Sequence, residues 1–290
     1  MKSSVLLILL VTFSFSVAKE SGKTPVTEKN KTTFLRIKKE GNTPVALQLA
    51  NVRYVPENGI PSDLRVDLIS AVHVADKSYY ENLNKLFKTY DVVLYELVAP
   101  EGTRVGDKAA SEGKGLLSMI QTGMKEILGL TFQLDEVNYS PKNFVHADIS
   151  PDDFMKSMDE KGESFFSMFL RMWLVGMQQQ ATNPDAMNDM DLLFAYFSDD
   201  REKQMKIVAA QQFISMDVVM DAMEGDKGST IVTARNLKAL KVLRREMEKG
   251  NKTFAIFYGA AHMPEMEKVL MKEFKLKKSQ VNWVDAWDLR

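Results

Sequence analysis

The sequence predicts an α/β protein: a central sheet with two related strand–helix–strand (βαβ) halves flanked by helices, plus a Met-rich helical insertion. The first half is recognised from two nearly continuous apolar runs, residues 65–74 and 91–98, which are typical of strands buried on both faces. Between them, residues 77–90 carry apolar side chains at helical spacing. This order predicts two parallel strands joined by a right-handed crossover.

The second half lies at the carboxyl end of the chain and follows the same order. Residues 253–258 are an apolar run, residues 264–274 have an amphipathic helical pattern, and residues 280–289 are the closing strand. We expect all four strands to belong to one sheet, with the two strands of each half parallel.

The two halves also match in the spacing of their polar residues. The segment SAVH, which ends at His73, corresponds to GAAH, which ends at His262. Glu96 lies 23 residues after His73, and Asp285 lies 23 residues after His262. This weak internal duplication predicts that the two histidines occupy equivalent places in the fold.

Residues 101–230, between the two halves, are the expected helical insertion. It contains four expected helices, over residues 115–128, 164–180, 187–198 and 202–223. Eleven of the 18 Met residues of the chain lie between Met155 and Met223. This concentration has three interpretations: a copper site, an adaptable binding wall or, most commonly for Met, side chains that fill irregular gaps in a core.

Composition excludes several classes of function. The 290 residues suffice for one large domain with a sizeable core. The 38 Lys and Arg residues are balanced by 39 Asp and Glu residues, so we expect no nucleic-acid partner. The absence of Cys excludes disulfides, thiolate metal sites and cysteine nucleophiles. The HExxH and GxSxG motifs are also absent, which argues against a zincin helix and a nucleophile elbow.

The amino terminus has the layout of a secretory signal peptide. Lys2 precedes an apolar run over residues 5–15, and small residues then form a cleavage site near Ala18. The alternative is an uncleaved anchor, but the run is short for a bilayer core of about 30 Å. We therefore expect an exported protein, periplasmic or secreted, without a stable transmembrane segment after cleavage. Residues 19–40 are the expected mobile leader, and residues 41–290 the expected domain.

His73 and His262 are the first candidates for chemistry, and His146 is the third His of the chain. Each of the first two follows the end of a predicted parallel strand, where sites form in open α/β sheets. The alternative for each is a hydrogen bond to its own turn. The duplicated positions favour a shared functional site over that alternative.

Glu96 is unusual because it lies in an apolar strand, where a carboxylate must be paired, protonated or bound to metal. A structural ion pair with Arg53 or Arg235 is one interpretation; a metal ligand or general base is the other. Burial predicts a raised pKa for this carboxyl. Asp285 has polar neighbours and is expected at a sheet edge, so we predict that it does not duplicate the role of Glu96.

Asp148 and Arg235 complete the candidate site, together with His146. Asp148, two residues after His146, is a candidate second-shell or direct metal ligand together with that His. The following Ser-Pro pair at Ser150 is a good helix start, and a capping loop is the alternative reading of the segment. Arg235 is a candidate to hold a substrate carbonyl or carboxylate, with a surface ion pair as the alternative.

Three of these segments together resemble the TraB/PrgY and Tiki family, within a superfamily that includes erythromycin esterases and ChaN-like haem-binding proteins. SAVH at His73 with the downstream Glu96 resembles the first GxxH motif and its Glu. The Arg-Asn pair at Arg235 and the GAAH ending at His262 resemble the later motifs. The first motif departs from the pattern because Ser70 replaces Gly.

The resemblance implies a sheet of two related halves with a helical insertion. For Tiki-type members it implies a metal-dependent peptidase that uses the two GxxH histidines and the Glu. For TraB-type members it implies inhibition of peptide signals, and for the esterase branch a hydrolysis that does not require metal. Function therefore transfers less directly than fold.

The function expected from the sequence is that of an exported hydrolase, a metal-dependent peptidase acting on a peptide or small protein. The expected ligands are His73, Glu96 and His262, with His146 and Asp148 as further candidates; nitrogen and oxygen donors suit Zn, Mn or Co. Two alternatives stay open. One is a non-catalytic peptide- or haem-binding protein; the other is a metal-independent esterase with His73 or His262 as general base.

Overall fold

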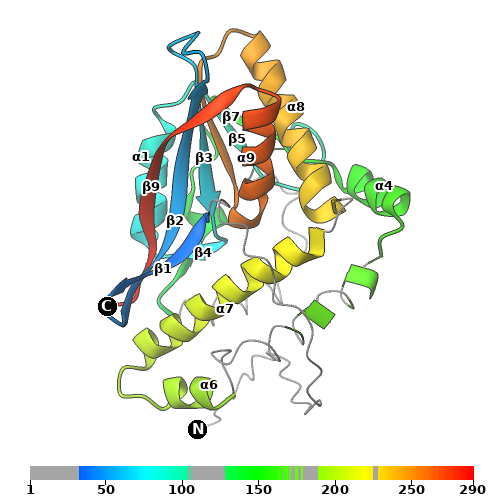
Figure 1. The fold of residues 1–290 in the computed structure, drawn as a ribbon. Coiled ribbons are helices and arrows are strands. Elements are labelled where there is room, and N and C mark those ends of the chain that lie inside the picture. The colour runs from blue at the N-terminus through cyan, green and yellow to red at the C-terminus, as the bar shows by residue number, and fades with distance from the viewer. Residues whose placement is uncertain are drawn as a thin grey trace.

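The computed structural model shows a mixed α/β fold, as the sequence predicts (Figure 1). It describes residues 33–103, 105, 128–164, 166–168, 170, 174–175, 178, 189–224 and 228–290, with side chains only to residue 215 in the segment that ends at 224. The expected signal peptide and most of the expected leader lie outside these residues.

A seven-stranded mixed sheet forms the centre of the molecule. Its strands are β1 (Leu35–Glu40), β2 (Thr43–Pro56), β3 (Arg65–Ala71), β5 (Val92–Tyr95), β7 (Phe144–His146), β8 (Thr253–Gly259) and β9 (Leu276–Asp288). In the order β3-β8-β5-β7 each strand is parallel to the next. β1 and β3 pair antiparallel with successive parts of β2, and β9 pairs antiparallel along most of β2. The sheet therefore has a parallel part and an antiparallel part that meet at β3.

The four expected strands lie in this one sheet, which confirms the topology prediction. β3 and β8 are parallel neighbours, and β5 is parallel to β8 on its other side. β9 runs in the same direction as β8, because β9 is antiparallel to β2 and β2 is antiparallel to β3. However, neither half pairs its own two strands. In the first half, β8 lies between β3 and β5. In the second half, β3 and β2 lie between β8 and β9.

Helices cover the sheet in two layers, each with its own core. One core includes Tyr79, Tyr80, Leu83 and Phe87 of α1 (Lys77–Phe87), together with Ala210 of α7 (Arg201–Glu224). The other core is built by α8 (Arg235–Glu248) and α9 (Met263–Lys272), which run beside each other in Figure 1. Because β3, β5 and β8 are buried on both faces, their sequences are apolar without alternation.

The predicted insertion is not wholly helical, and this is a correction. It contributes β7 to the central sheet, and β6 (Thr131–Phe132) pairs with β4 (Val74–Ala75) in a small second sheet. Strands of two or three residues are too short to show a hydrophobic period. Its helices are α3 (Gln133–Glu136), α4 (Pro151–Lys161), α6 (Asp189–Tyr196) and α7. The helix expected at 115–128 lies almost wholly outside the described residues, and that at 164–180 is described only in part.

The predicted boundary of the leader at residue 40 is also wrong, since β1 begins at Leu35. Phe34 and Leu35 are buried in the two cores, and this anchors the start of the strand. The apolar–polar alternation of β1 is short and lies in a Lys-rich segment, so it does not stand out as a strand in the sequence. No helix among the described residues is long and apolar enough to cross a membrane.

Candidate active site

Three parallel strands deliver polar residues to the same edge of the sheet. Glu96 directly follows β5, and its backbone N–H donates to the carbonyl of Phe257 in β8 at 3.3 Å. Asp148 follows β7, which is parallel to β5 on the other side. β8 ends at Gly259, and a single 3-10 turn, η3 (Ala260–His262), carries His262 to the same edge. The carboxyl edge of the parallel strands is thus the predicted place for a site.

Arg235 joins two acidic residues at this edge. Its Nη2 donates to Oε1 of Glu96 at 2.7 Å and to Oδ2 of Asp148 at 2.6 Å. Its Nε donates to Oδ1 of Asp148 at 3.0 Å, so the guanidinium holds Asp148 with two nitrogens. The side chains of Arg235, Glu96 and Asp148 are 11%, 14% and 0% exposed. Two carboxylates facing one guanidinium leave this group with a net charge of −1.

Arg235 reaches the site because the chain enters α8 through a π-helical turn, η2 (Thr230–Ala234). Ser229 caps this turn: its side chain accepts from the backbone N–H of Val232 at 3.1 Å. π-Helical turns are rare and occur frequently at functional sites. Arg235 is therefore the first residue of α8 and projects from the start of the helix toward the strand ends.

His262 is buried and held in one orientation. Its Nδ1 lies 2.7 Å from Oδ1 of Asn236, and the Asn236 side-chain NH₂ donates to the His262 carbonyl at 3.2 Å. Because an amide oxygen only accepts hydrogen bonds, Nδ1 carries the proton and a neutral ring has its lone pair on Nε2. Nε2 lies 3.7 Å from Oε1 of Glu96. The basic nitrogen therefore faces the carboxylate.

Glu96 is ionised, and the expectation of a raised pKa is wrong. Burial alone raises the pKa of this carboxyl, but the positive charge of His262 in its protonated form, the charge of Arg235 and the Gly259 backbone N–H lower it more. The net effect lowers the pKa from its ordinary value of 4.5 to about 2. The Gly259 N–H donates to Oε2 at 2.7 Å. Glu96 is consequently a weak base and a persistent negative charge beside His262.

Two residues that sequence reasoning missed support this arrangement. Asn236 was noted only as the neighbour of Arg235, yet it orients the His262 ring. Tyr258, in β8, donates its hydroxyl to the carbonyl of Ala147 at 2.5 Å and so fixes the residue before Asp148. Burial raises the pKa of Tyr258 well above its ordinary value, so the hydroxyl stays protonated as a donor. A Tyr at the end of a buried strand was the available signal for this role.

His73 and His146 have different surroundings from His262. His73 is exposed, and its carbonyl accepts from the Gln133 backbone N–H at 2.9 Å. The charge of His73 contributes to the lowered pKa of Glu96, as the smallest of the five causes. His146 donates from Nε2 to the carbonyl of Leu97 at 2.6 Å, because a carbonyl only accepts. His146 thus holds the chain just after Glu96.

Only two of the residues expected to bind metal have donor atoms at a separation that suits one ion. Glu96 and His262 fit as a pair, since donors bound at about 2.0–2.2 Å to one ion lie roughly 3–4 Å apart. Asp148 does not fit, because Arg235 engages both of its oxygens. Within the described residues, no three His, Asp or Glu side chains gather as a metal-binding group. The arrangement provides a pair of donors rather than a three-ligand centre.

Asp285 lies apart from this group in the topology. It is an exposed residue of β9, and its Oδ1 accepts from Nε2 of Gln48 at 2.6 Å. β9 is next to β2, whereas Glu96 follows a strand that pairs with β8. Asp285 thus lies exposed on an outer strand of the sheet, as we expected. Its lack of a catalytic role stays a prediction.

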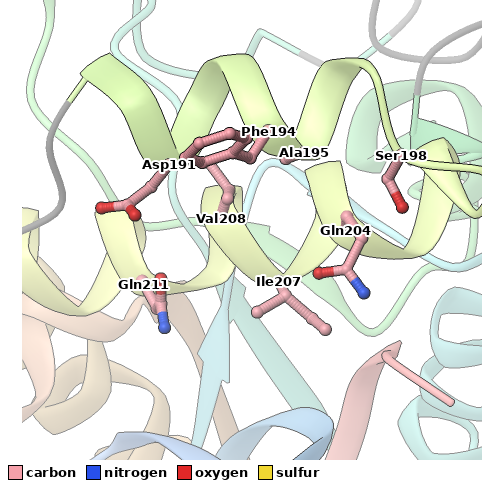
Figure 2. Close-up of a pocket in the computed structure, with 8 residues that line it drawn as sticks. All are labelled: Asp191, Phe194, Ala195, Ser198, Gln204, Ile207, Val208 and Gln211. Carbon is pink, nitrogen blue, oxygen red and sulfur yellow. The ribbon is translucent and has the colours of Figure 1, made fainter.

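A separate pocket of about 510 Å³ lies between α6 and α7 (Figure 2). Figure 2 shows Phe194, Ile207 and Val208 among its lining, with the polar side chains of Asp191 and Gln211 at one end. None of the residues discussed above lines it. The pocket is therefore separate from the strand-edge group.

Comparison of the chain with protein-family models, with curated proteins and with solved structures finds no match. The case for a function rests on the residues gathered at the strand edge and on the resemblance of their sequence motifs.

Proposed function

We propose that the protein is a hydrolase that cleaves an amide or ester carbonyl compound, with a peptide as the substrate that the TraB/Tiki resemblance implies. One observation carries the proposal: Nε2 of His262 faces the ionised Glu96 at 3.7 Å, and Arg235 contacts the same carboxylate oxygen at 2.7 Å. A basic nitrogen, a fixed negative charge and a cation thus meet at one point. These are the parts that hydrolysis of a carbonyl requires.

His262 is the proposed general base. A water molecule that donates one hydrogen to Nε2 and the other to Oε1 of Glu96 is held for attack on a carbonyl carbon. When the new C–O bond forms, Nε2 takes the water proton and the carbonyl electron pair moves to its oxygen. Glu96 does not accept this proton, because its pKa of about 2 makes it the weaker base. It stabilises the imidazolium, as the negative charge beside a catalytic His does in hydrolytic triads.

Arg235 is the proposed partner for the negative charge that develops on the substrate oxygen. Its Nη1 makes no hydrogen bond to the described residues, while Nε and Nη2 are held by Asp148 and Glu96. The two carboxylates fix the plane of the guanidinium before substrate binds, which is the condition for strong electrostatic stabilisation. Collapse of the intermediate breaks the C–N or C–O bond, and His262 returns its proton to the leaving group.

A metal-dependent peptidase is the second candidate, and the 3.7 Å separation of the Glu96 and His262 donor atoms favours it. Glu96 and His262 would hold the ion; His73, the third ligand that the sequence predicts, is exposed and does not gather with them as a metal-binding group among the described residues. A divalent ion bound there would acidify a bound water and polarise the carbonyl. The two candidates use the same residues and differ in the need for metal.

Turnover assays with the purified protein test both candidates. We expect cleavage within a panel of fluorogenic peptides and p-nitrophenyl esters, and no cleavage by a Glu96→Gln variant that melts at a similar temperature. Activity that survives exhaustive chelation supports the metal-independent reaction. Activity that is lost on chelation and restored by Zn, Mn or Co supports the peptidase. Wild-type protein that binds peptide or haem without any turnover contradicts both.

A further inference from the structure

We propose that Glu265 is a positioning residue: through Asn236, it sets which nitrogen of His262 carries the proton. This inference rests on the proposed role of His262 as general base. Nothing in the sequence patterns pointed to Glu265, which lies three residues after His262 in the first turn of α9. The hydrogen bonds of its carboxylate go to Asn236 and Thr233, and we assign its effect on the imidazole to the bond with Asn236.

The contacts of Glu265 form a short chain to the imidazole. Its Oε2 accepts from the side-chain NH₂ of Asn236 at 2.6 Å, and its Oε1 accepts from the Thr233 hydroxyl at 2.9 Å. Oδ1 of Asn236 in turn lies 2.7 Å from Nδ1 of His262. Asn236 is 1% exposed, so no solvent competes for these positions. The order along the chain is therefore carboxylate, amide, imidazole and the carboxylate of Glu96.

The chain has one consistent arrangement of hydrogens. An amide has a donor end and an acceptor end, and Glu265 is acceptor-only once ionised. The donor end of Asn236 must therefore face Glu265, and the acceptor end must face Nδ1 of His262. Nδ1 then carries the proton and Nε2 keeps the lone pair that faces Glu96. Since this tautomer follows from the hydrogen-bond network, it is open to direct measurement.

The reversed arrangement shows why Glu265 matters. If the Asn236 amide turned over, its oxygen would face a carboxylate 2.6 Å away and its NH₂ would donate to Nδ1. The proton of a neutral His262 would then lie on Nε2, and Nε2 would donate to Glu96 in place of accepting from water. The His262 carbonyl also favours the observed amide orientation, but its contact is longer, at 3.2 Å, and lacks the charge of Glu265.

A structural role for Glu265 must be separated from this positioning role. An acidic residue in the first turn of a helix stabilises it through the helix dipole whether or not it touches Asn236. Glu267, on the same helix, is the matched control. It accepts from the Tyr54 hydroxyl at 2.9 Å and pairs with Lys278 at 2.7 Å, so these two contacts are directed to β2 and β9.

Nitrogen NMR of the imidazole rings tests the proposal directly, because the chain has only three His residues. The full-length protein is labelled with ¹⁵N-histidine and recorded at a pH where the rings are neutral. The His262 signals are assigned by their loss in His262→Ala. In wild type we expect a protonated Nδ1 and an unprotonated Nε2 for His262.

Three variants give the decisive comparison. Glu265→Gln keeps an acceptor for Asn236 and should retain the wild-type tautomer. Glu265→Ala should show a mixture that includes protonated Nε2, with kcat reduced about tenfold and KM nearly unchanged. Glu267→Gln should retain the wild-type spectrum and kcat.

The outcomes separate this inference from the proposed function. An unchanged His262 tautomer in a folded Glu265→Ala variant overturns the inference, whatever the turnover. A changed tautomer in a protein without any turnover upholds the positioning role and overturns the hydrolase proposal. Equal spectral changes in Glu265→Ala and Glu267→Gln would show a general effect of α9 and would also overturn the inference.

Discussion

The two halves of the fold place their histidines alike and their carboxylates differently. His73 and His262 each follow one of two parallel, neighbouring strands, β3 and β8. Glu96 follows β5, which pairs directly with β8, whereas Asp285 lies on β9, beyond β3 and β2. Equal spacing along the chain therefore brings the histidines to equivalent strand ends but does not determine which strands become neighbours.

The surroundings of the duplicated positions differ as well. His262 is buried and bonded to Asn236, while His73 is exposed. Ser70, the counterpart of Gly259, turns its hydroxyl to the carbonyl of Ala50 at 2.7 Å. Gly259 instead gives its backbone N–H to Glu96. The first half thus supplies the negative charge, and the second half supplies the base and the Gly259 N–H that binds that charge.

The largest difference in activity between the two halves should appear when each histidine is replaced separately. We expect His262→Ala to lower kcat about 1000-fold, because it removes the general base, and His73→Ala to lower it less than about tenfold. Steady-state kinetics on the cleaved peptide or ester measure both, with thermal melts as the folding control. Equal losses would show that the two histidines act as one unit, as the metal-dependent alternative requires.

Arg235→Lys should have the next largest effect, a loss of about 100-fold in kcat. A Lys ammonium cannot hold Asp148 with two nitrogens and also reach Glu96 with the planar geometry of a guanidinium. The matched control is Arg53→Lys. Arg53 makes the same kind of double contact with Asp67, at 2.9 Å from Nε and from Nη2, in the antiparallel part of the sheet. If both variants lose stability and neither loses activity, Arg235 has only a structural role.

Much of the fold was predictable because it depends on local patterns. Continuous apolar runs identified β3, β5 and β8, and helical spacing identified α1 and α9. The order of the strands was not predictable, since the register of β9 with β2 joins segments more than 200 residues apart. β1 and β7 were missed because each is short and has no continuous apolar run. β2 was missed as well, although it is the longest described strand, with 14 residues.

The site was predictable in its members and in one of its bonds, the Glu96–Arg235 ion pair that the sequence offers as one interpretation. Glu96, Asp148, Arg235 and His262 were all candidates from the sequence, and the structure brings these four together. The sequence could not assign Asp148 to Arg235, because the ion pair spans 87 positions. It also could not give the sign of the pKa shift of Glu96. That sign depends on whether the nearby positive charges outweigh burial.

The acid stability of the protein should depend on Glu96. Its folded-state pKa is lowered, so its ionised form stabilises the fold above pH 4.5, and this contribution is lost as the pH falls toward about 2. Glu96→Gln should therefore lose less stability than wild type between pH 5.5 and 3. Urea unfolding at the two pH values measures this, with Asp285→Asn expected to retain the wild-type difference. A Glu96→Gln variant with the full wild-type difference would contradict the assigned charge state.

Gly259→Ala should have the smallest effect, a decrease of about two- to fivefold in kcat. A methyl group there would lie 3.4 Å from Oε2 of Glu96 and 3.6 Å from Cδ2 of His262. The φ of Gly259 is −52°, which any residue adopts, so the backbone is not strained. The N–H bond to Glu96 is kept. A loss above about 100-fold, with the melting temperature unchanged, would mean that substrate needs the space beside Gly259.

The most direct test of the account compares the two carboxylates that the duplication equates. The central claim is that Glu96 serves the reaction and Asp285 does not. Glu96→Gln should abolish hydrolysis and leave a folded protein, since Gln keeps the size of the side chain and its one amide oxygen can still accept from Gly259 or from Arg235. Asp285→Asn should cost less than tenfold, about 1.4 kcal/mol of barrier. The measurement is turnover of one substrate by the two purified variants, with thermal melts as the control. Equal loss of turnover in both variants would contradict the claim and would indicate a site with two working carboxylates.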